Sequence, residues 1–253
     1  MNKLKMAVLA AGLSFGSAQA TIVEVQTTQG NFQINLFDEG TPKTVENFLK
    51  YVNNEDFNGV VYHRLVTDLV LQGGGYTFDG STFKAIESYG NVVNEPVYSN
   101  VRGTIAMAKL ANDPNSATSQ WFINLSDNSA NLDLQNGGFT VFGQVIGNGM
   151  DVVDELSKFE CNEYPLVNTT DEQCADLKSG ALTLDAQRLI TIEHVAIIDS
   201  NTNTLGDLSP KENTLIKEPV QPPVISNDSG GSFGALLTLM GGLLVFRRKR
   251  TTH

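Results

Sequence analysis

Short strand-like runs, separated by glycine-containing turns, place the strongest constraint on how this chain folds. Alternating apolar and polar residues at 22–26 and 32–37 flank a connection that contains Gly30, which is typical of a β-hairpin. Helical spacing of apolar residues is confined to two segments, one that opens at Thr41-Pro42 and one at 150–156. The pattern favours a mainly β barrel or sandwich over an alternating α/β sheet. The other strand-like runs are 60–66, 69–72, 103–109, 120–124, 140–145 and 190–198.

The charge balance and the histidines argue against two classes of function. The 253 residues carry 17 Lys and Arg against 28 Asp and Glu, a formal net charge of −11, whereas nucleic-acid binding needs clustered cations. His63, His194 and His253 are spread over the whole chain and predict no zinc site. The glycine run 72–75 lacks the lysine and the helix of a phosphate-binding loop. We therefore expect no nucleic-acid partner, no metal and no other cofactor.

Residues 1–20 have the pattern of a secretory signal peptide. Lys3 and Lys5 precede a short apolar stretch, and small residues at alternate positions lead to a cleavage site after Ala20. A buried first helix is the alternative, but strand-like sequence begins at Thr21 without a helical transition. We expect a protein exported from a bacterial cytoplasm to the periplasm or the cell surface.

The C-terminal residues 230–253 have the pattern of a sorting signal or a membrane anchor. Gly230-Gly231 precede an apolar run at 233–246, which as a helix would reach only about 21 Å, and a basic cluster follows at 247–250. The arrangement resembles the bacterial GlyGly-CTERM sorting signals, which implies a rhomboid-type protease as a partner. A permanent single-span anchor is the open alternative, and the polar, proline-containing residues 199–229 are expected to be a flexible linker.

Cys161 and Cys174 are the only cysteines of the chain and lie in a polar, loop-like stretch. In an exported protein an even pair at close spacing favours a disulfide. The bond would close a loop of about 14 residues and contribute about 3 kcal/mol on the loop-entropy model. A free redox pair is the alternative, but Cys-x-x-Cys spacing is missing.

The strand-like run 60–66 carries the polar residues of most interest. Strand alternation predicts Tyr62, Arg64 and Val66 on one face and Val61, His63 and Leu65 on the other. By composition alone, an arginine on a solvated face and a structural histidine would be the ordinary interpretation.

Several motifs read together favour a functional interpretation of this run. Their order and spacing over residues 21–198 resemble the cyclophilin family of peptidyl-prolyl isomerases. The exported bacterial members are the most similar, because Asn131 and Phe139 stand where the best-known eukaryotic members have tryptophan and histidine. The resemblance implies a closed antiparallel eight-stranded β-barrel capped by two helices, with an insertion at about 160–188. The motifs are FNGVVYHRL at 57–65, LQGG at 71–74, GTIAMA at 103–108, SQWFI at 119–123, NLD at 131–133 and VFG at 141–143.

The implied reaction needs no cofactor and no covalent intermediate. Rotation of an X-Pro bond crosses a barrier of ~18–20 kcal/mol, because the twisted amide loses its conjugation. A catalyst has only to stabilise the twisted state, in which the prolyl nitrogen regains a lone pair that accepts a hydrogen bond. The permanent charge and directed donors of an arginine suit that task.

The resemblance also assigns the site residues. Arg64 takes the catalytic position, an apolar pocket holds the proline ring, two glutamines bind the peptide backbone, and Ala108 lies in the adjoining groove. Each apolar residue taken alone would be interpreted as ordinary core packing. The substrate-binding set comprises His63, Leu69, Val70, Gln72, Ala108, Gln120, Phe122, Leu132 and Phe139.

Two departures from the family pattern keep other functions open. Leu69 replaces a phenylalanine on the pocket wall, and Lys109 stands where the family often has asparagine. The expected function is a monomeric isomerase that acts on X-Pro segments of exported, incompletely folded polypeptides. The alternatives are a proline-peptide binding module with vestigial catalysis and a surface domain that uses the barrel only as a scaffold.

Overall fold

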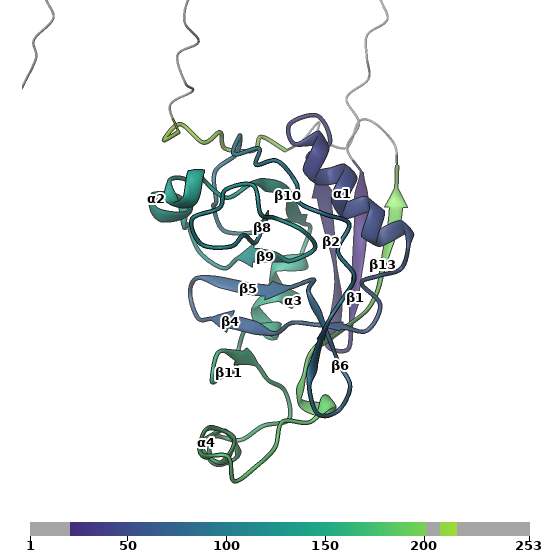
Figure 1. Cartoon of the computed structure of the whole chain (residues 1–253), viewed down its shortest axis with the longest axis vertical. Helices are drawn as coiled ribbons and strands as arrows, with labels where there is room; N and C mark the ends of the chain where they lie inside the picture. The colour runs from purple at the N-terminus through teal and green to yellow at the C-terminus, as the bar shows by residue number, and fades with distance from the viewer. Residues whose placement is uncertain (1–20, 201–207, 217–253) are drawn as a thin grey trace, which may run out of the picture. The chain divides into compact units, whose positions relative to one another are not determined.

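One antiparallel sheet of eleven strands forms most of the described structure (Figure 1). The computed structural model describes residues 21–200 and 208–216. The strands are β1 Ile22–Thr27, β2 Gly30–Leu36, β3 Val60–Val61, β4 Arg64–Val66, β5 Val70–Gly73, β6 Tyr76–Phe78, β7 Phe83–Ala85, β8 Thr104–Met107, β9 Trp121–Asn124, β10 Val141–Ile146, β11 Glu160–Cys161, β12 Tyr164–Pro165 and β13 Thr191–Asp199. The helices are α1 Pro42–Asn53, α2 Ser129–Leu132, α3 Gly149–Leu156 and α4 Asp171–Ser179, with the 3₁₀ helices η1 Gln135–Gly137 and η2 Ala186–Arg188.

The sheet has the order β4-β5-β9-β8-β10-β2-β1-β13-β3-β6-β7. Only Tyr62 and His63 separate β3 from β4 in the chain. The Tyr62 N–H donates to Ile190 O at 3.0 Å and the His63 N–H to Gln72 O at 3.1 Å, so this short link bonds to the residue before β13 on one side and to β5 on the other. With β3 and β4 taken as one strand and the β6–β7 hairpin set aside, the order contains eight strand positions. The prediction of a mainly β, antiparallel fold is confirmed, and the chain runs directly from β3 into β4.

The main apolar core lies inside this curled sheet, and two helices cover it. Phe48 and Tyr51 from α1 pack with Trp121 and Phe142 from the sheet, and all four side chains are buried. α1 contacts β13, and α3 contacts β2 and β10. Both helices begin where the sequence predicts them, because their apolar residues repeat at helical spacing and can face the core.

The start of α1 differs from the prediction in one detail. Thr41 occupies the N-cap position, but its hydroxyl donates to Phe37 O instead of accepting from the helix. The Glu95 carboxylate takes that role, accepting from the Thr44 N–H at 2.9 Å and the Thr44 hydroxyl at 2.8 Å. A carboxylate also suits the positive end of the helix dipole.

The predicted faces of the run 60–66 are correct within β4 and wrong at Tyr62. Arg64 and Val66 are partly exposed on the outer side and Leu65 is buried, as predicted, whereas Tyr62, predicted to share the face of Arg64, is buried in the main core with Leu65. The break between β3 and β4 at Tyr62 and His63 shifts the alternation by one residue, and simple period-two counting cannot anticipate such a shift. The shift leaves Arg64 on the outer face of the barrel.

The glycine run 72–75 permits close packing between β5 and β9. Gly74 has φ +78°, and a Cβ atom there would lie 2.5 Å from the Trp121 side chain. A Cβ atom at Gly75 would lie 2.4 Å from the Gln120 side chain. The run is therefore a packing feature of the sheet, which agrees with its rejection as a phosphate-binding loop.

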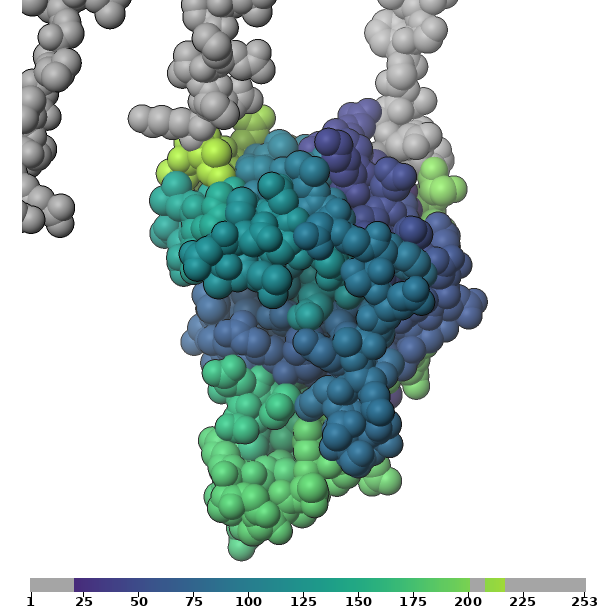
Figure 2. Space-filling model, in the orientation of Figure 1, coloured from purple at the N-terminus to yellow at the C-terminus, as the bar shows by residue number. Residues whose placement is uncertain are grey.

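The predicted insertion is a small structural unit of its own. It contains the β11–β12 hairpin and helix α4, and Figure 1 shows both at one end of the described molecule, next to β4. The Cys161–Cys174 disulfide is present, as predicted, and links the hairpin to α4. Sequence reasoning treated Cys174 as part of a loop, whereas it lies within α4. In Figure 2 the insertion, in green, projects below the blue and teal body.

Part of the predicted linker 199–229 packs against the barrel. β13 continues through Asp199, and the segment 208–216, which we call the strap, bonds to the chain before β8. The Ser99 N–H donates to Lys211 O and the Asn213 N–H to Val97 O, both at 2.8 Å. The predicted signal peptide, the C-terminal sorting segment and the remaining linker residues lie outside the described residues. None of the helices in the described residues has the length and apolar character to span a membrane.

Candidate active site

A row of side chains on three neighbouring strands forms the base of the site. Arg64 on β4 pairs in register with Gln72 on β5, and Gln72 pairs with Phe122 on β9. Directly paired residues of an antiparallel sheet project from the same face at close spacing. Leu65, Leu71 and other alternating neighbours point into the main core, so this row lies on the outer face of the barrel.

A cavity of about 260 Å³ opens above this row. It collects eight of the ten residues that the resemblance assigns to the site. Gln120 lines a smaller cavity of about 110 Å³, which shares Gln72, Ala108 and Lys109 with the first. His63 lines neither of these cavities. The larger cavity is lined by Arg64, Leu69, Val70, Gln72, Ala108, Lys109, Phe122, Asn131, Leu132, Gln135 and Phe139.

The floor of the larger cavity is an apolar cluster separate from the main core. Val70, Phe122 and Leu132 are buried in this cluster, and Leu69 and Phe139 pack against it. The Phe122 and Phe139 rings meet edge to face, with centroids 5.7 Å apart. A preformed apolar cavity of this kind can take a small apolar ring at little ordering cost.

The two glutamines are held by a hydrogen bond to each other. Gln72 Nε2 donates to Gln120 Oε1 at 2.9 Å. Each primary amide has two donors and two acceptor sites, so this bond leaves the Gln72 carbonyl oxygen and the Gln120 amino group for other partners. The pair can therefore bind a peptide backbone through both a donor and an acceptor.

Arg64 lies at the rim of the cavity with 39% of its side chain exposed. Its Nε lies 3.6 Å from Glu163 Oε2, on the turn between β11 and β12. The guanidinium is a cation whose planar fork offers five donors. It is a fixed cation beside an apolar cavity.

His63 lies behind the row, packed against an aromatic ring. Its imidazole meets the Tyr76 ring edge to face, with centroids 4.8 Å apart. Burial is the main effect that lowers the pKa of His63 below the usual 6.5, and hydrogen bonds with the Val61 backbone and the Gln120 side chain partly offset it. The ring therefore packs against Tyr76 and bonds a glutamine of the site, which suits a supporting role better than that of a charged ligand group.

Lys109 holds the loop that carries Phe139. Its Nζ donates to Gly138 O at 2.7 Å and to Asn136 O at 2.9 Å, and lies 4.7 Å from the centroid of the Phe139 ring. Burial lowers the pKa of Lys109 to about 8. This residue, noted in the sequence only as a departure from the family pattern, shapes the pocket wall.

A buried polar network supports the same loop from behind. Asp133 is 1% exposed and accepts hydrogen bonds from the Ser99 hydroxyl, the Asn100 backbone at 2.7 Å and the Asn100 side chain at 3.0 Å. Asn100 also donates to Phe139 O at 3.1 Å. These bonds fix Leu132 and Phe139 relative to the sheet, since both residues lie within or next to the network.

Sequence reasoning missed four residues of the site. Lys109, Asn131 and Gln135 line the cavity, and Glu163 contacts Arg64. Asn131 lies inside the NLD motif and could have been included on that ground. Glu163 had no such signal, because only the fold brings the insertion to β4.

Comparison with known proteins identifies a family. Residues 22–175 match the family model described as cyclophilin type peptidyl-prolyl cis-trans isomerase/CLD. A peptidyl-prolyl cis-trans isomerase of Acinetobacter baylyi is 37% identical over 175 residues, covering 67% of this chain and 90% of the relative. Peptidyl-prolyl cis-trans isomerase B of Escherichia coli is 39% identical over 140 residues, covering 53% of this chain and 83% of the relative.

Solved structures support the fold. A cyclophilin type peptidyl-prolyl cis-trans isomerase of Cryptosporidium parvum superposes with a TM-score of 0.52 at 21% identity, covering 72% of this chain and 99% of that one. A second structure of that protein, in the presence of the dipeptide Ala-Pro, gives a TM-score of 0.51 at 20% identity. With the family model, the relatives and the cavity geometry in agreement, the chain belongs to the cyclophilin-type peptidyl-prolyl cis-trans isomerase family.

Proposed function

We propose that this isomerase assists the folding of exported proteins, with Arg64 as its catalytic residue. The observation that carries the proposal is a guanidinium at the rim of a cavity of about 260 Å³ with an apolar floor. The substrates are X-Pro segments of polypeptides that have left the cytoplasm and are not fully folded. The protein acts as a monomer and without a cofactor.

In this proposal each part of the site has its own task. The proline ring enters the cavity over Phe122 and Leu132, and the two glutamines hold the peptide backbone beside it. Arg64 then donates a hydrogen bond to the prolyl nitrogen as the amide twists. Because that lone pair is available only in the twisted state, the bond stabilises the transition state more than either ground state. One directed donor of this kind contributes on the order of 10²–10³ in rate.

The location outside the cytoplasm is supported by several sequence features. Residues 1–20 have the pattern of a secretory signal, and a disulfide within the insertion suits an oxidising compartment. The C-terminal residues 230–253 hold the protein at the membrane until a rhomboid-type protease releases it into the periplasm or to the cell surface. The mass of the mature C-terminus tests this step, because a product that retains Arg247–Arg250 was not processed.

The assignment of Arg64 is tested by measuring the isomerisation of a cis-enriched Ala-Pro peptide by the wild-type protein, Arg64→Ala and Arg102→Ala. We expect Arg64→Ala to lower kcat/KM by about 10²-fold, whereas Arg102→Ala should leave it unchanged. Arg102 is the matched control, because it forms an ion pair of similar exposure with Asp154 away from the cavity. Equal activity of Arg64→Ala and the wild-type protein would refute the role of Arg64.

The same assay separates the proposal from its rival. A binding module would hold proline peptides in the cavity while isomerisation stayed at the uncatalysed rate. Leu69 is the feature that keeps this rival open, because it forms a smaller wall than the phenylalanine of the family. Peptide binding at a face remote from Arg64 would instead support a scaffold function.

A further inference from the structure

We propose that Glu163 of the insertion is a positioning residue that orients Arg64 for catalysis. The inference rests on the proposed function, and it gives the insertion a direct part in the reaction. Cyclophilin chemistry requires a guanidinium aimed at the prolyl nitrogen, yet Arg64 lies partly exposed on the outside of the barrel. A flexible, exposed side chain needs a partner to limit its rotamers.

The structure provides that partner from the β11–β12 hairpin. Glu163 Oε2 lies 3.6 Å from Arg64 Nε, and the Leu65 N–H donates to Glu163 O. Glu160, at the start of the hairpin, accepts a hydrogen bond from the Thr67 hydroxyl at 2.7 Å. The hairpin is thus attached to the chain at two points directly after Arg64, and its carboxylate is held beside the guanidinium.

The backbone at Glu163 is strained for its residue type. Asn162 and Glu163 form the two-residue turn of the hairpin, with φ angles of +54° and +66°. Such turns favour asparagine followed by glycine, and a glutamate in the left-handed region costs folding free energy. A strained residue whose side chain meets the catalytic arginine is the pattern expected where function outweighs local stability.

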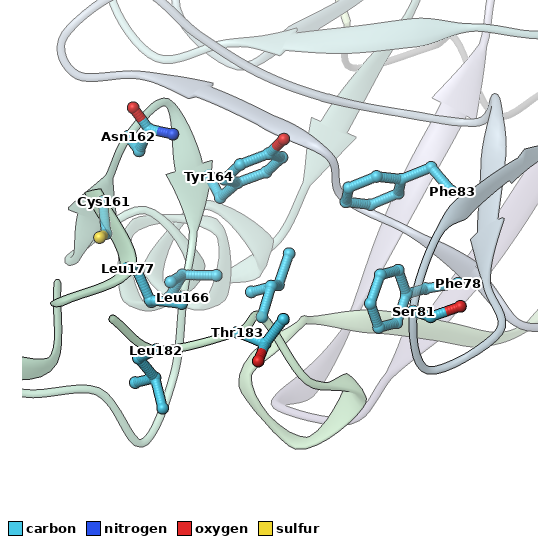
Figure 3. Close-up of a pocket in the computed structure, with 11 residues that line it drawn as sticks. Phe78, Ser81, Phe83, Cys161, Asn162, Tyr164, Leu166, Leu177, Leu182 and Thr183 are labelled. Atoms are coloured by element: carbon cyan, nitrogen blue, oxygen red, sulfur yellow. The ribbon is translucent and has the colours of Figure 1, made fainter. Parts of the chain in front are cut away.

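The rest of the insertion gives the hairpin a rigid base. Cys161 is bonded to Cys174, and the Tyr164 ring stacks on Phe83 with centroids 5.6 Å apart and an interplanar angle of 12°. Figure 3 shows Tyr164 between Asn162 and Phe83, at a cavity of about 290 Å³ that Leu166 and other apolar side chains line. The turn is therefore fixed by covalent and aromatic contacts as well as by its own hydrogen bonds.

The position of the carboxylate explains how it can aid catalysis. It faces the Nε side of the guanidinium and leaves the two terminal nitrogens for the prolyl nitrogen. Because the pair is exposed, its effect is modest, and we expect it to change the rate by about fivefold. The effect belongs to kcat, since Arg64 engages the prolyl nitrogen only in the twisted state.

The test compares three variants of the full chain. Glu163→Gln removes the charge, and Glu163→Gly removes the side chain and relieves the turn. Asn162→Gly is the matched control, because it relaxes the neighbouring turn residue and leaves the carboxylate in place. We expect both Glu163 variants to lose about fivefold in kcat with KM unchanged, while Glu163→Gly unfolds at an equal or higher temperature than the wild type. Asn162→Gly should retain full activity.

The dependence of kcat on ionic strength provides a second test, because a purely structural role of Glu163 would not make kcat depend on salt. Molar salt should lower kcat of the wild-type protein toward that of Glu163→Gln and change the variant much less. The proposal would be overturned if Glu163→Gln had the same kcat as the wild-type protein at low salt, or if Asn162→Gly lost as much kcat as the Glu163 variants. Either result would leave the isomerase function intact. A wild-type protein without isomerase activity would overturn both.

Discussion

At the scale of single residues, His63 shows that a position within a family motif does not by itself place a side chain in the binding cavity. The residue lies next to Arg64 in the chain, but its imidazole packs against Tyr76 and lines neither cavity of the site. Its burial disfavours the protonated form. The consequence is a dependence of stability on pH.

We expect the free energy of unfolding to fall as the pH drops below about 6.5. The folded pKa of His63 lies below its unfolded value of 6.5, so the unfolded chain binds more protons in the interval between them. Stability is therefore complete above the unfolded pKa and declines as acid is added. Urea unfolding at pH 7.5 and 5.5 measures the difference, which His63→Gln should reduce. His194→Gln is the control, and an equal reduction in that variant would contradict the assignment to His63.

At the scale of secondary-structure elements, the insertion consists of β11, β12 and α4 and is attached next to β4. The disulfide connects β11 to α4, and Glu160 and Glu163 attach the hairpin to the barrel. α4 buries Cys174, and its Leu177 packs against the small apolar cluster of the insertion, so the disulfide is the covalent part of its attachment. The barrel, by contrast, has a large core of its own, against which Val167 of the insertion packs.

Replacing Cys161 and Cys174 together by serine should therefore loosen the insertion and spare the barrel. The loop-entropy model predicts a loss of about 3 kcal/mol for a loop of this length. Hydrogen exchange locates the loss, and we expect amides of α4 to exchange about 100-fold faster while those of β1, β2 and β13 keep their protection. Equally faster exchange in the barrel strands would show that the disulfide stabilises the whole domain.

The sequence predicted the elements whose apolar residues repeat regularly. α1 and α3 have an apolar face, and β1, β2 and β13 alternate over enough residues for the period to be clear. α4 was missed because almost all of its residues are polar. Its signals were a capping box, in which Thr170 and Gln173 bond each other's backbone, and Gly180 at its end. The break that divides β3 from β4 left no signal in the residue pattern.

The site was predictable as far as the family motifs reach. Arg64, Gln72 and Phe122 come from three motifs, and strand pairing places them in one row. Lys109 could not be assigned a role, because its partners Asn136 and Gly138 lie on a loop whose path depends on the tertiary fold. The contact between Glu163 and Arg64 could not be predicted either, since no local pattern relates the insertion to β4.

At the scale of the whole molecule, the main apolar core and the candidate site lie on opposite faces of the curled sheet. Its inner face packs around Trp121 and Phe142, and its outer face carries the cavity beside Arg64. The outer cavity depends on segments from different parts of the chain. The loop 133–139 forms one wall, and the insertion supplies the carboxylate at the rim.

The strap 208–216 lies against the same loop. Asn213 Nδ2 donates to Asp133 O at 3.0 Å, and Ile216 Cδ1 lies so near Gly138 that a Cβ atom there would be 2.6 Å from it. Asp133 and Gly138 flank the loop that places Phe139 in the cavity, and Lys109 bonds the same Gly138 from the other side. Residues assigned to the linker by composition thus contact the loop that forms one wall of the pocket.

The double variant Asn213→Ala with Ile216→Ala should therefore affect both stability and substrate binding. The double variant loses the hydrogen bond to Asp133, the two bonds that Asn213 Oδ1 accepts from the Leu215 and Ile216 backbone, and a half-buried apolar side chain. These losses should lower the free energy of unfolding by about 2 kcal/mol. A looser loop should raise KM for a proline peptide more than it lowers kcat, since Phe139 contacts the ring in both ground and transition states. Leu215→Ala is the control, because that side chain is 45% exposed. A double variant that behaves like this control would show that the strap covers the loop without holding it.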